Sequence, residues 1–418
     1  MKTIRGKFSL VNIALVIVGI FIITSLLLVG CKSSKKKSSK TDPSNTPPTV
    51  VVLKTPLMAV SFNRTPTLTV SGVQAGDTVR LFNSSECAEE DLVASAIVED
   101  GKTSVDLTTE TLSADPANYH FYANRTNSAG ASACSSASAS YQIVACVNEY
   151  YLPIEGNAEL GTDAFCVMQT EAKGKDDVNG PWPCYCEHPW RNITPDDAKA
   201  ACRNKHNITN GSCDLLSNRQ WMAIARDIEA TAANWSGGEV GVGKINRGYS
   251  DKHGSWIPLR IDDPEDHWFG VNSSDWSQKR THVLSNGSII WDFAGNAYEW
   301  VDWETGGETL TLGPNTCSPE QVDLYTVDCA DLDPNDYLPG NPANIDPANY
   351  TMANYGIGGF YGTTEEARVS GGGGAAMRGG YYKTGENAGI FRLYLGYSRD
   401  YTGDDVSFRC ACTVYPAE

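Results

Sequence analysis

Three stretches of sequence decide the fold of this chain. Residues 378–382 read RGGYY, residues 408–411 read FRCA, and residues 292–300 read DFAGNAYEW. The paired glycines allow a sharp turn that residues with a Cβ rarely adopt. No cysteine lies between Cys329 and Cys410. The segment between the RGG turn and Cys410 therefore holds no thiol. It is rich in tyrosine instead.

Taken together, these stretches resemble the signature of the sulfatase-modifying-factor family. Its formylglycine-generating enzymes share a C-type-lectin-like fold with a group of binding proteins. Residues 164–171 (AFCVMQTE) resemble the opening strand of the family, and residues 215–221 (LLSNRQW) resemble the start of its helix. The segments occur in the family's order over roughly 151–412. The resemblance implies an α+β domain with little regular secondary structure at residues 146–418.

The catalytic centre of those enzymes has no counterpart in this sequence. The enzymes bind copper through two cysteines that follow the RGG turn, and thiolates are the ligands that Cu(I) prefers. Residues 382–409 offer no thiolate, and the six histidines never lie four apart, as the His-x₃-His-x-Glu triad of related iron enzymes requires. We therefore expect recognition without copper. A formylglycine-generating oxidase, or another enzyme of this fold, is the alternative function.

The same resemblance implies a structural calcium site at residues 292–299. It assigns side-chain ligands to Asp292 and Glu299 and backbone carbonyls to Gly295 and Ala297. Hard oxygen ligands on a tight turn suit Ca²⁺. Members of the family commonly have an amide side chain at the position of Asp292, so this residue departs from the family pattern. The alternative is a capped turn in which Glu299 accepts hydrogen bonds from backbone amides.

The C-terminal loops are the predicted ligand-binding region. Residues 378–409 combine tyrosine with serine, glycine and asparagine, the composition of antibody binding loops. Residues 389–395 (GIFRLYL) and 406–410 (VSFRC) also resemble the variable region of diversity-generating-retroelement target proteins. That resemblance implies a protein or glycan ligand. The candidate contacts are Tyr382, Tyr394, Tyr397, Arg399, Tyr401, Gly403 and Asp404. An aromatic loop packed on the core is the alternative.

The N-terminus predicts export and a lipid anchor. A positively charged start precedes the apolar, uncharged residues 11–30, and residues 28–31 read LVGC, which resembles a bacterial lipoprotein cleavage box. Residues 1–30 would be the signal peptide, Cys31 the lipidated residue, and residues 31–48 a disordered tether. This predicts an envelope protein anchored by lipid, at the outer membrane and exposed at the surface. A membrane-spanning anchor is the alternative, since about 20 apolar residues span a bilayer.

Residues 49–145 alternate apolar and polar side chains between glycine turns. Short strands at such spacing predict an all-β sandwich. Residues 70–79 (VSGVQAGDTV) resemble a bacterial Ig-like domain, which would act as a spacer. Cys87 and Cys134 are the only cysteines of this region, so we expect them to pair.

The number of cysteines predicts disulfides. Thirteen cysteines less Cys31 leave twelve, an even number that predicts disulfides in an exported chain. A zinc protein is the alternative. Cys317 and Cys329 are expected to close a local loop in an acidic insert, where a second cation is the alternative. The resemblance also implies pairing of Cys202 with Cys410.

The net charge of −17 disfavours nucleic acid as a partner.

Two helices can be predicted from their N-terminal signals. Thr194 and Pro195 supply an N-cap and a first-turn proline before residues 198–205. Ser217 and Gln220 form a capping box ahead of a helix whose apolar positions recur at helical spacing. Those apolar positions are Trp221, Ile224, Ala225 and Ile228.

Overall fold

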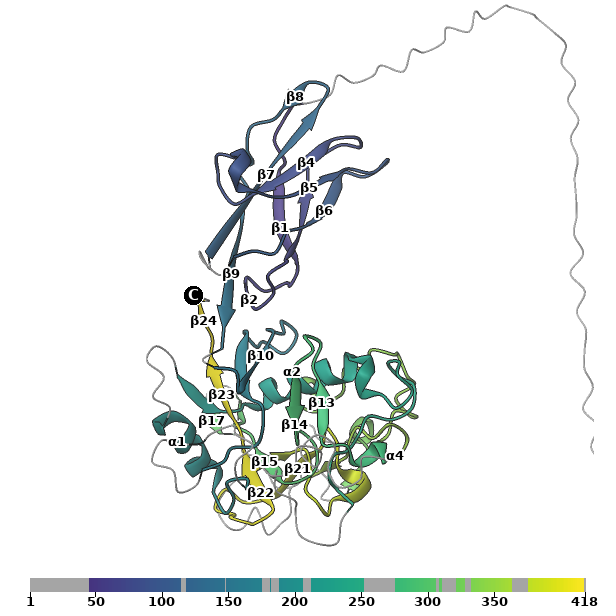
Figure 1. Ribbon diagram of the computed structural model, residues 1–418. Helices are drawn as coiled ribbons and strands as arrows, with labels where there is room; N and C mark the ends of the chain where they lie inside the picture. Colours follow the sequence, from purple (N-terminus) through teal and green to yellow (C-terminus); the bar gives the residue numbers. More distant parts are fainter. Residues whose placement is uncertain are drawn as a thin grey trace, which may run out of the picture. The chain divides into compact units, whose positions relative to one another are not determined.

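The structure is a computed structural model (Figure 1). It describes residues 45–113, 118–146, 148–174, 181, 188–205, 212–251, 275–305, 308–309, 321–327, 332–362 and 375–416. These residues belong to one compact unit, Asn45–Glu418. The signal peptide, Cys31 and the expected Cys317–Cys329 pair lie outside them. Within these ranges, no helix is both long and apolar enough to cross a bilayer.

The described residues of the N-terminal part of this unit form strands and one short 3₁₀ turn. A three-stranded sheet has the order β1-β3-β6, and a second sheet has the order β2-β9-β7-β4-β5, with β8 on β7 and β24 on β9. The bounds are β1 Val50–Thr55, β2 Val60–Ser61, β3 Thr67–Ser71, β4 Thr78–Phe82, β5 Leu92–Ile97, β6 Ser104–Thr108, β7 Asn118–Asn127, β8 Gly130–Ala131, β9 Ala139–Ala145, β24 Tyr415–Pro416 and the 3₁₀ turn Glu89–Asp91.

Both N-terminal sheets contribute to one apolar core. Leu68 and Leu107 come from the first sheet, and Leu81 and Phe121 come from the second. All four side chains are almost fully buried. Alternate residues of a strand point to opposite faces, so the period-two pattern of the sequence predicted this arrangement correctly. The expected disulfide between Cys87 and Cys134 is present.

In the described residues, the C-terminal part is built on two larger sheets and two strand pairs, one of which is β16 with β17. A four-stranded sheet has the order β10-β11-β23-β12, a six-stranded sheet has the order β18-β19-β21-β20-β15-β22, and β13 pairs with β14. The bounds are β10 Tyr151–Ile154, β11 Phe165–Met168, β12 Cys213–Leu215, β13 Thr281–Val283, β14 Ile289–Trp291, β15 Tyr298–Trp300, β16 Glu304–Thr305, β17 Glu308–Thr309, β18 Gln321–Val322, β19 Phe360–Tyr361, β20 Ala375–Arg378, β21 Leu393–Tyr397, β22 Val406–Phe408 and β23 Cys410–Thr413.

The three stretches that opened the sequence analysis meet in the six-stranded sheet. β15 pairs antiparallel with β20, and Glu299 lies opposite Arg378. On its other edge β15 pairs in parallel with β22, and Trp300 lies opposite Phe408. The amide of Gly295 also donates to the carbonyl of Gly379 at 3.2 Å. The DFAGNAYEW, RGG and FRCA stretches are thus neighbouring backbone segments.

Both predicted helices are confirmed. α1 spans Pro195–Lys205 and α2 spans Asn218–Ala230, which begins with the predicted capping box. The apolar stripe of α2 is buried, and the Trp221 ring stacks on Phe293 at 3.8 Å. The other short helical segments are α4 Met352–Tyr355 and the 3₁₀ turns Ala232–Asn234, Trp276–Gln278, Leu324–Thr326, Pro334–Asp336 and Gly385–Asn387.

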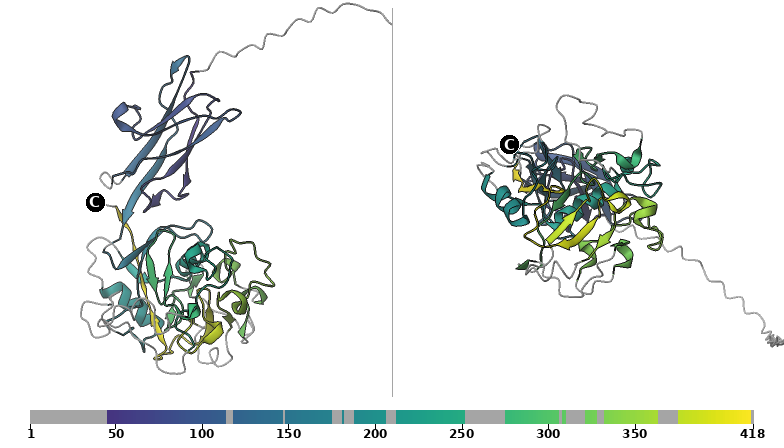
Figure 2. Two further views of the ribbon diagram at one scale, coloured as in Figure 1. Left: turned by 45° about the vertical axis from the view of Figure 1, so that its right-hand side comes forward. Right: turned by 90° about the horizontal axis from the view of Figure 1, so that it is seen from below.

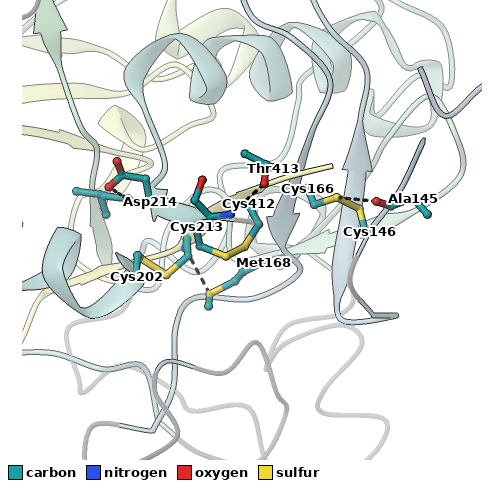
Figure 3. Close-up of a disulfide and its surroundings, with 12 residues drawn as sticks. Ala145, Cys146, Cys166, Met168, Cys202, Cys213, Asp214, Cys412 and Thr413 are labelled. Atoms are coloured by element: carbon teal, nitrogen blue, oxygen red, sulfur yellow. Dashed lines mark hydrogen bonds between the residues drawn. A yellow bond between two sulfur atoms is a disulfide. The ribbon is translucent and has the colours of Figure 1, made fainter. Parts of the chain in front are cut away.

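Strands β22 and β23 follow one another and link the two large sheets, as the yellow arrows in Figures 1 and 2 show. Disulfides fix this segment (Figure 3). Cys202 of α1 pairs with Cys410, as the family resemblance implied. Cys213 of β12 pairs with Cys412, which lies directly opposite it. A further disulfide joins Cys146 to Cys166. The sequence did not predict the last two pairs.

Candidate ligand-binding face

The C-terminal tyrosines gather on the outer face of β21. Leu393 and Leu395 are buried, whereas Tyr394 and Tyr397 are partly exposed. Residues three apart on a regular strand face opposite sides of a sheet. Here β21 has one extra residue relative to β20, because Ala375 pairs with Tyr397 and Met377 pairs with Tyr394. This β-bulge brings both rings to the same face.

Gly396 makes room for this arrangement. A Cβ on Gly396 would lie 2.7 Å from three atoms of the Tyr394 ring and hydroxyl. A contact that short cannot form without moving the ring. The glycine therefore allows the Tyr394 ring to lie across the backbone of its own strand.

Four tyrosine rings form a continuous row. The Tyr361 and Tyr394 rings stack at 4.7 Å with 7° between their planes, which follows from their opposite positions in the parallel β19–β21 pair. Tyr394 contacts Tyr397 at 5.2 Å, and Tyr397 stacks on Tyr401 at 3.8 Å with 2° between planes. Such contacts add about 0.5–1.5 kcal/mol per pair beyond burial. The row is therefore ordered before any ligand arrives.

A second branch supports the row from beneath. The buried Tyr298 ring lies 5.5 Å from Tyr394 and 5.2 Å from Tyr381, and Tyr381 meets Tyr382 edge-on at 5.1 Å. Burial raises the pKa of Tyr381 to about 12, so its hydroxyl keeps its proton at neutral pH. We call the seven residues the tyrosine cluster: Tyr298, Tyr361, Tyr381, Tyr382, Tyr394, Tyr397 and Tyr401.

The loop after β21 is held in place by its own polar groups. The Tyr401 hydroxyl donates to Asp405 Oδ1 at 2.8 Å, and the Tyr401 amide donates to the Ser398 carbonyl at 3.1 Å. The amide of Asn192 donates to the Gly403 carbonyl at 3.0 Å. Burial raises the pKa of Asp405 above its usual value. The loop is thus attached both to itself and to the segment before α1.

Charged side chains of both signs surround the tyrosine cluster. Arg399 forms an ion pair with Asp196 at the start of α1. The ammonium of the exposed Lys383 lies over the Tyr382 ring at 5.0 Å. The Arg392 guanidinium lies 5.4 Å from the Tyr394 ring, but it is buried and adds no charge to the rim. Asp404 is exposed. A ligand at this face would meet aromatic surface at the centre and charge at the rim.

The structure brings most of the predicted ligand-binding residues together. Tyr394, Tyr397 and Tyr401 lie in the row, with Arg399 and Asp404 in the adjoining loop. Tyr382 differs, because it is only 6% exposed and supports Tyr381 rather than offering contact area. Gly403 packs against Tyr401, where a Cβ would lie 2.3 Å from its hydroxyl.

The candidate residues from the sequence did not include three members of the cluster. Tyr381 directly precedes the candidate Tyr382, whereas Tyr361 and Tyr298 come from other parts of the chain. Each lies far from the C-terminal loops in the sequence and joins them only through strand pairing. The aromatic FY pair at residues 360–361 was the available signal, but nothing local indicates that it pairs with β21.

The predicted calcium residues lie in a buried ion network. Arg280 donates to both carboxylate oxygens of Asp292, and Arg409 donates to both oxygens of Glu299. The side chains in these pairs are at most 1% exposed. Glu171 and Lys173 form a third buried pair, 3.6 Å apart. Three carboxylates and three cations thus balance one another.

These residues do not fit a calcium ion. Every carboxylate oxygen of Asp292 and Glu299 already accepts from a guanidinium, so Ca²⁺ would have to displace two charge-assisted pairs. The structure also differs from the capped-turn alternative, in which backbone amides donate to Glu299. The Ala297 amide donates to Glu171 instead. Across the described ranges, no group of three or more His, Cys, Asp or Glu side chains could hold a metal.

The cysteines in the described part of the chain are joined in four disulfides. These are Cys87–Cys134, Cys146–Cys166, Cys202–Cys410 and Cys213–Cys412. A disulfide sulfur is neither a nucleophile nor a thiolate ligand. None of these eight cysteines offers a thiolate for copper.

Comparison with known proteins gives distant structural likenesses. No protein-family model matches the chain, and no curated protein matches it. The solved structure of Treponema denticola variable protein 1 is similar over 64% of this chain and 92% of its own, at 14% identity and a TM-score of 0.25. The M1 and I1 variants of the major tropism determinant each cover 84% of this chain and 81% of their own. Their identities are 10% and 11%, and both TM-scores are 0.27. Such TM-scores do not establish a shared fold.

Proposed function

We propose that this chain is a surface-displayed bacterial lipoprotein that binds a protein or glycan through its tyrosine cluster. The observation that carries the proposal is the row of four tyrosine rings in contact, two stacked pairs joined by a tilted contact, all partly exposed. The scaffold is a non-catalytic domain similar to formylglycine-generating enzymes. The N-terminal sheets are an Ig-like spacer between this domain and the anchor.

Stacking prepares the tyrosines for binding. Ordering a flexible side chain at an interface costs about 0.5–1.5 kcal/mol. The rings of Tyr394, Tyr397 and Tyr401 are already held by their neighbours and by the Tyr401–Asp405 hydrogen bond, so little of this cost remains. Tyrosine also offers apolar area and a hydroxyl on one rigid side chain, which suits proteins and sugars.

The composition and the charged rim fit a macromolecular ligand other than nucleic acid. The chain carries a formal charge of −17, which opposes a phosphate backbone. The rim residues Lys383, Glu386 and Asp404 are exposed and Arg399 is partly exposed, so neither sign of charge dominates. A mixed rim of this kind favours specificity and orientation over attraction to one charge.

Display at the surface is supported by the sequence of the first 48 residues. A lipid on Cys31 followed by a polar tether would leave the folded unit free of the bilayer. Radiolabelled palmitate incorporation tests the anchor. Label in the wild type and none in Cys31→Ala supports it, whereas equal label in both removes it.

The C-terminal loops are proposed to vary between isolates, as in diversity-generating-retroelement targets. Sequencing the 3′ end of the gene from several isolates tests this. Variation confined to exposed positions of residues 381–405 supports it. Identical codons, with no template repeat or reverse transcriptase nearby, would remove variation from the proposal and leave binding intact.

The enzymatic alternative has a direct test of its own. The chain is incubated with copper and a peptide that contains Cys-x-Pro-x-Arg, and the peptide is examined by mass spectrometry. We expect the peptide cysteine to remain unchanged, because no pair of cysteines follows the RGG turn within residues 381–409 of the sequence. Formylglycine in the peptide would overturn the non-catalytic proposal.

The binding claim is tested on arrays of glycans and of surface proteins. Wild type is compared with the Tyr397→Ala/Tyr401→Ala variant, which removes the closest stacked pair. Tyr150→Ala is the matched control, since Tyr150 is 40% exposed and lies outside the cluster. We expect array signals that the double variant loses and the control keeps. Signals that survive in both variants would contradict the proposal.

A further inference from the structure

The buried ion network contains one cation that no hydrogen bond satisfies. The Lys173 side chain is fully buried, and its Nζ lies 3.6 Å from Glu171 Oε2, beyond hydrogen-bond distance. Nζ has no hydrogen-bond partner among the described residues. A buried ammonium normally needs its full set of acceptors, because removing it from water costs several kcal/mol. Lys173 therefore needs an explanation other than an ordinary ion pair.

The side chain of Asn296 meets the same carboxylate oxygen. Asn296 Nδ2 lies 2.8 Å from Glu171 Oε2, and Asn296 Oδ1 has no hydrogen-bond partner among the described residues. Asn296 is also 1% exposed. A lysine amine, a carboxamide and a carboxyl group thus converge inside the protein. The nitrogen and oxygen of an amide can be exchanged by a flip, after which a protonated Glu171 would donate to Oδ1.

The surrounding charges allow the Glu171–Lys173 pair to become neutral. Arg280 balances Asp292 and Arg409 balances Glu299, so a proton can pass from Lys173 to Glu171 without leaving a net charge buried. Burial favours this transfer, because a neutral pair avoids the cost of holding two charges away from water. A neutral amine is a nucleophile, and a protonated carboxyl group is an acid.

We propose that Lys173 and Asn296 form an intramolecular isopeptide bond, with Glu171 as the catalytic acid and base. Lys173 Nζ attacks Asn296 Cγ while Glu171 protonates the carbonyl oxygen. Glu171 then transfers a proton from Nζ to Nδ2. As the Cγ–Nδ2 bond breaks and ammonia leaves, the proton on the oxygen returns to Glu171 and the new amide carbonyl forms. One amide replaces another, so the reaction needs no oxidant, reductant or further reactant.

The bond would have a clear structural consequence. Lys173 follows β11 in the segment where the Ala172 amide donates to Phe408 of β22, and Asn296 lies in the turn before β15. The link would join these two segments covalently, beside the disulfides of β23. It would also remove from the interior a side-chain nitrogen that has no hydrogen-bond partner among the described residues. The inference does not depend on what the tyrosine cluster binds.

Peptide mapping of the full chain tests the bond. Purified wild-type protein is reduced, digested with trypsin and analysed by mass spectrometry. We expect a branched peptide that joins the Lys173 and Asn296 segments, with a mass one ammonia below the sum of its parts. Lys173→Arg, Asn296→Ala and Glu171→Gln should each remove it. Glu229→Gln changes a buried carboxyl group outside the network and should keep it.

The wild-type result alone decides the proposal, so a variant that fails to fold does not obscure it. Unlinked peptides with intact Lys173 and Asn296, from wild-type protein that melts cooperatively, would overturn the bond. A link from Lys173 to Asp292, one water lighter, would overturn the assignment to Asn296. A full yield of branched peptide from Glu171→Gln would overturn the role of Glu171.

Discussion

At the residue scale, the main feature is that the charged residues of the fold-deciding stretches are buried and form ion pairs inside the protein. Asp292, Glu299 and Arg409 belong to the stretches that define the family resemblance, and all three are buried in ion pairs. Their residue types could be read from the sequence. Their partners could not, because the pairing of Arg280 with Asp292 depends on the register of β13 and β14, which places these two residues opposite each other.

Removal of Arg409 should be costly, because Glu299 would remain charged and buried. We expect Arg409→Met to lower the free energy of unfolding by about 3–5 kcal/mol. Replacing Glu299 as well, in Arg409→Met/Glu299→Leu, should recover much of the loss. Urea denaturation measures the free energy of unfolding of the wild type, the single variant and the double variant. Arg399→Met is the control, since its partner Asp196 is exposed and the expected loss is below about 1 kcal/mol. Equal losses in the single variants would contradict this account.

Calcium should not stabilise the turn at residues 292–299. Its carboxylates are neutralised by guanidinium groups, so the ion would gain little by binding. We expect the same Tm in excess CaCl₂ and in excess EGTA, with MgCl₂ as a control for ionic strength. A rise in Tm that saturates with calcium, and that Glu299→Gln abolishes, would restore the calcium site.

At the element scale, local sequence signals were sufficient to predict helices and strands. They were not sufficient to predict which distant strands pair. α1 and α2 were predicted because an N-cap and a capping box lie within a few residues of the helices they start. The period-two strands of the N-terminal sheets were equally local. The place of Tyr361 beside Tyr394 was not predictable, since it depends on a parallel pairing between distant short strands. The bulge in β21 also left no clear trace in the sequence.

The C-terminal end of α2 provides a pH test. Glu229 is buried and accepts hydrogen bonds from the Tyr350 hydroxyl and from the amides of Gly340 and Asn341. Burial raises its pKa from 4.5 to about 7. The folded state therefore keeps a proton that the unfolded state releases, and stability falls as pH rises through this window.

Glu229→Gln should remove this contribution. Relative to the variant, the wild type should lose roughly 3 kcal/mol between about pH 4.5 and pH 7, from about 1.4 kcal/mol per pKa unit. Urea denaturation at a series of pH values measures the difference. Parallel stability curves for the two proteins would show that Glu229 does not titrate in this range.

At the scale of the whole molecule, covalent and ionic links surround the tyrosine cluster. Cys202–Cys410 and Cys213–Cys412 hold β23, which continues from β22, and the buried ion network lies against the same segment. Fixed supports of this kind keep a binding surface ordered without a ligand. The tyrosine-rich region could be seen in the sequence, while the order of the rings follows from sheet topology.

The central claim is that the tyrosine row is the contact surface. It is tested most directly by the Kd of the ligand with the strongest array signal, measured for wild type, Tyr397→Ala and Tyr150→Ala. Loss of a central aromatic contact costs about 2 kcal/mol or more, so Tyr397→Ala should weaken binding roughly 30-fold while Tyr150→Ala leaves it unchanged. An unchanged Kd for a folded Tyr397→Ala protein would contradict the claim.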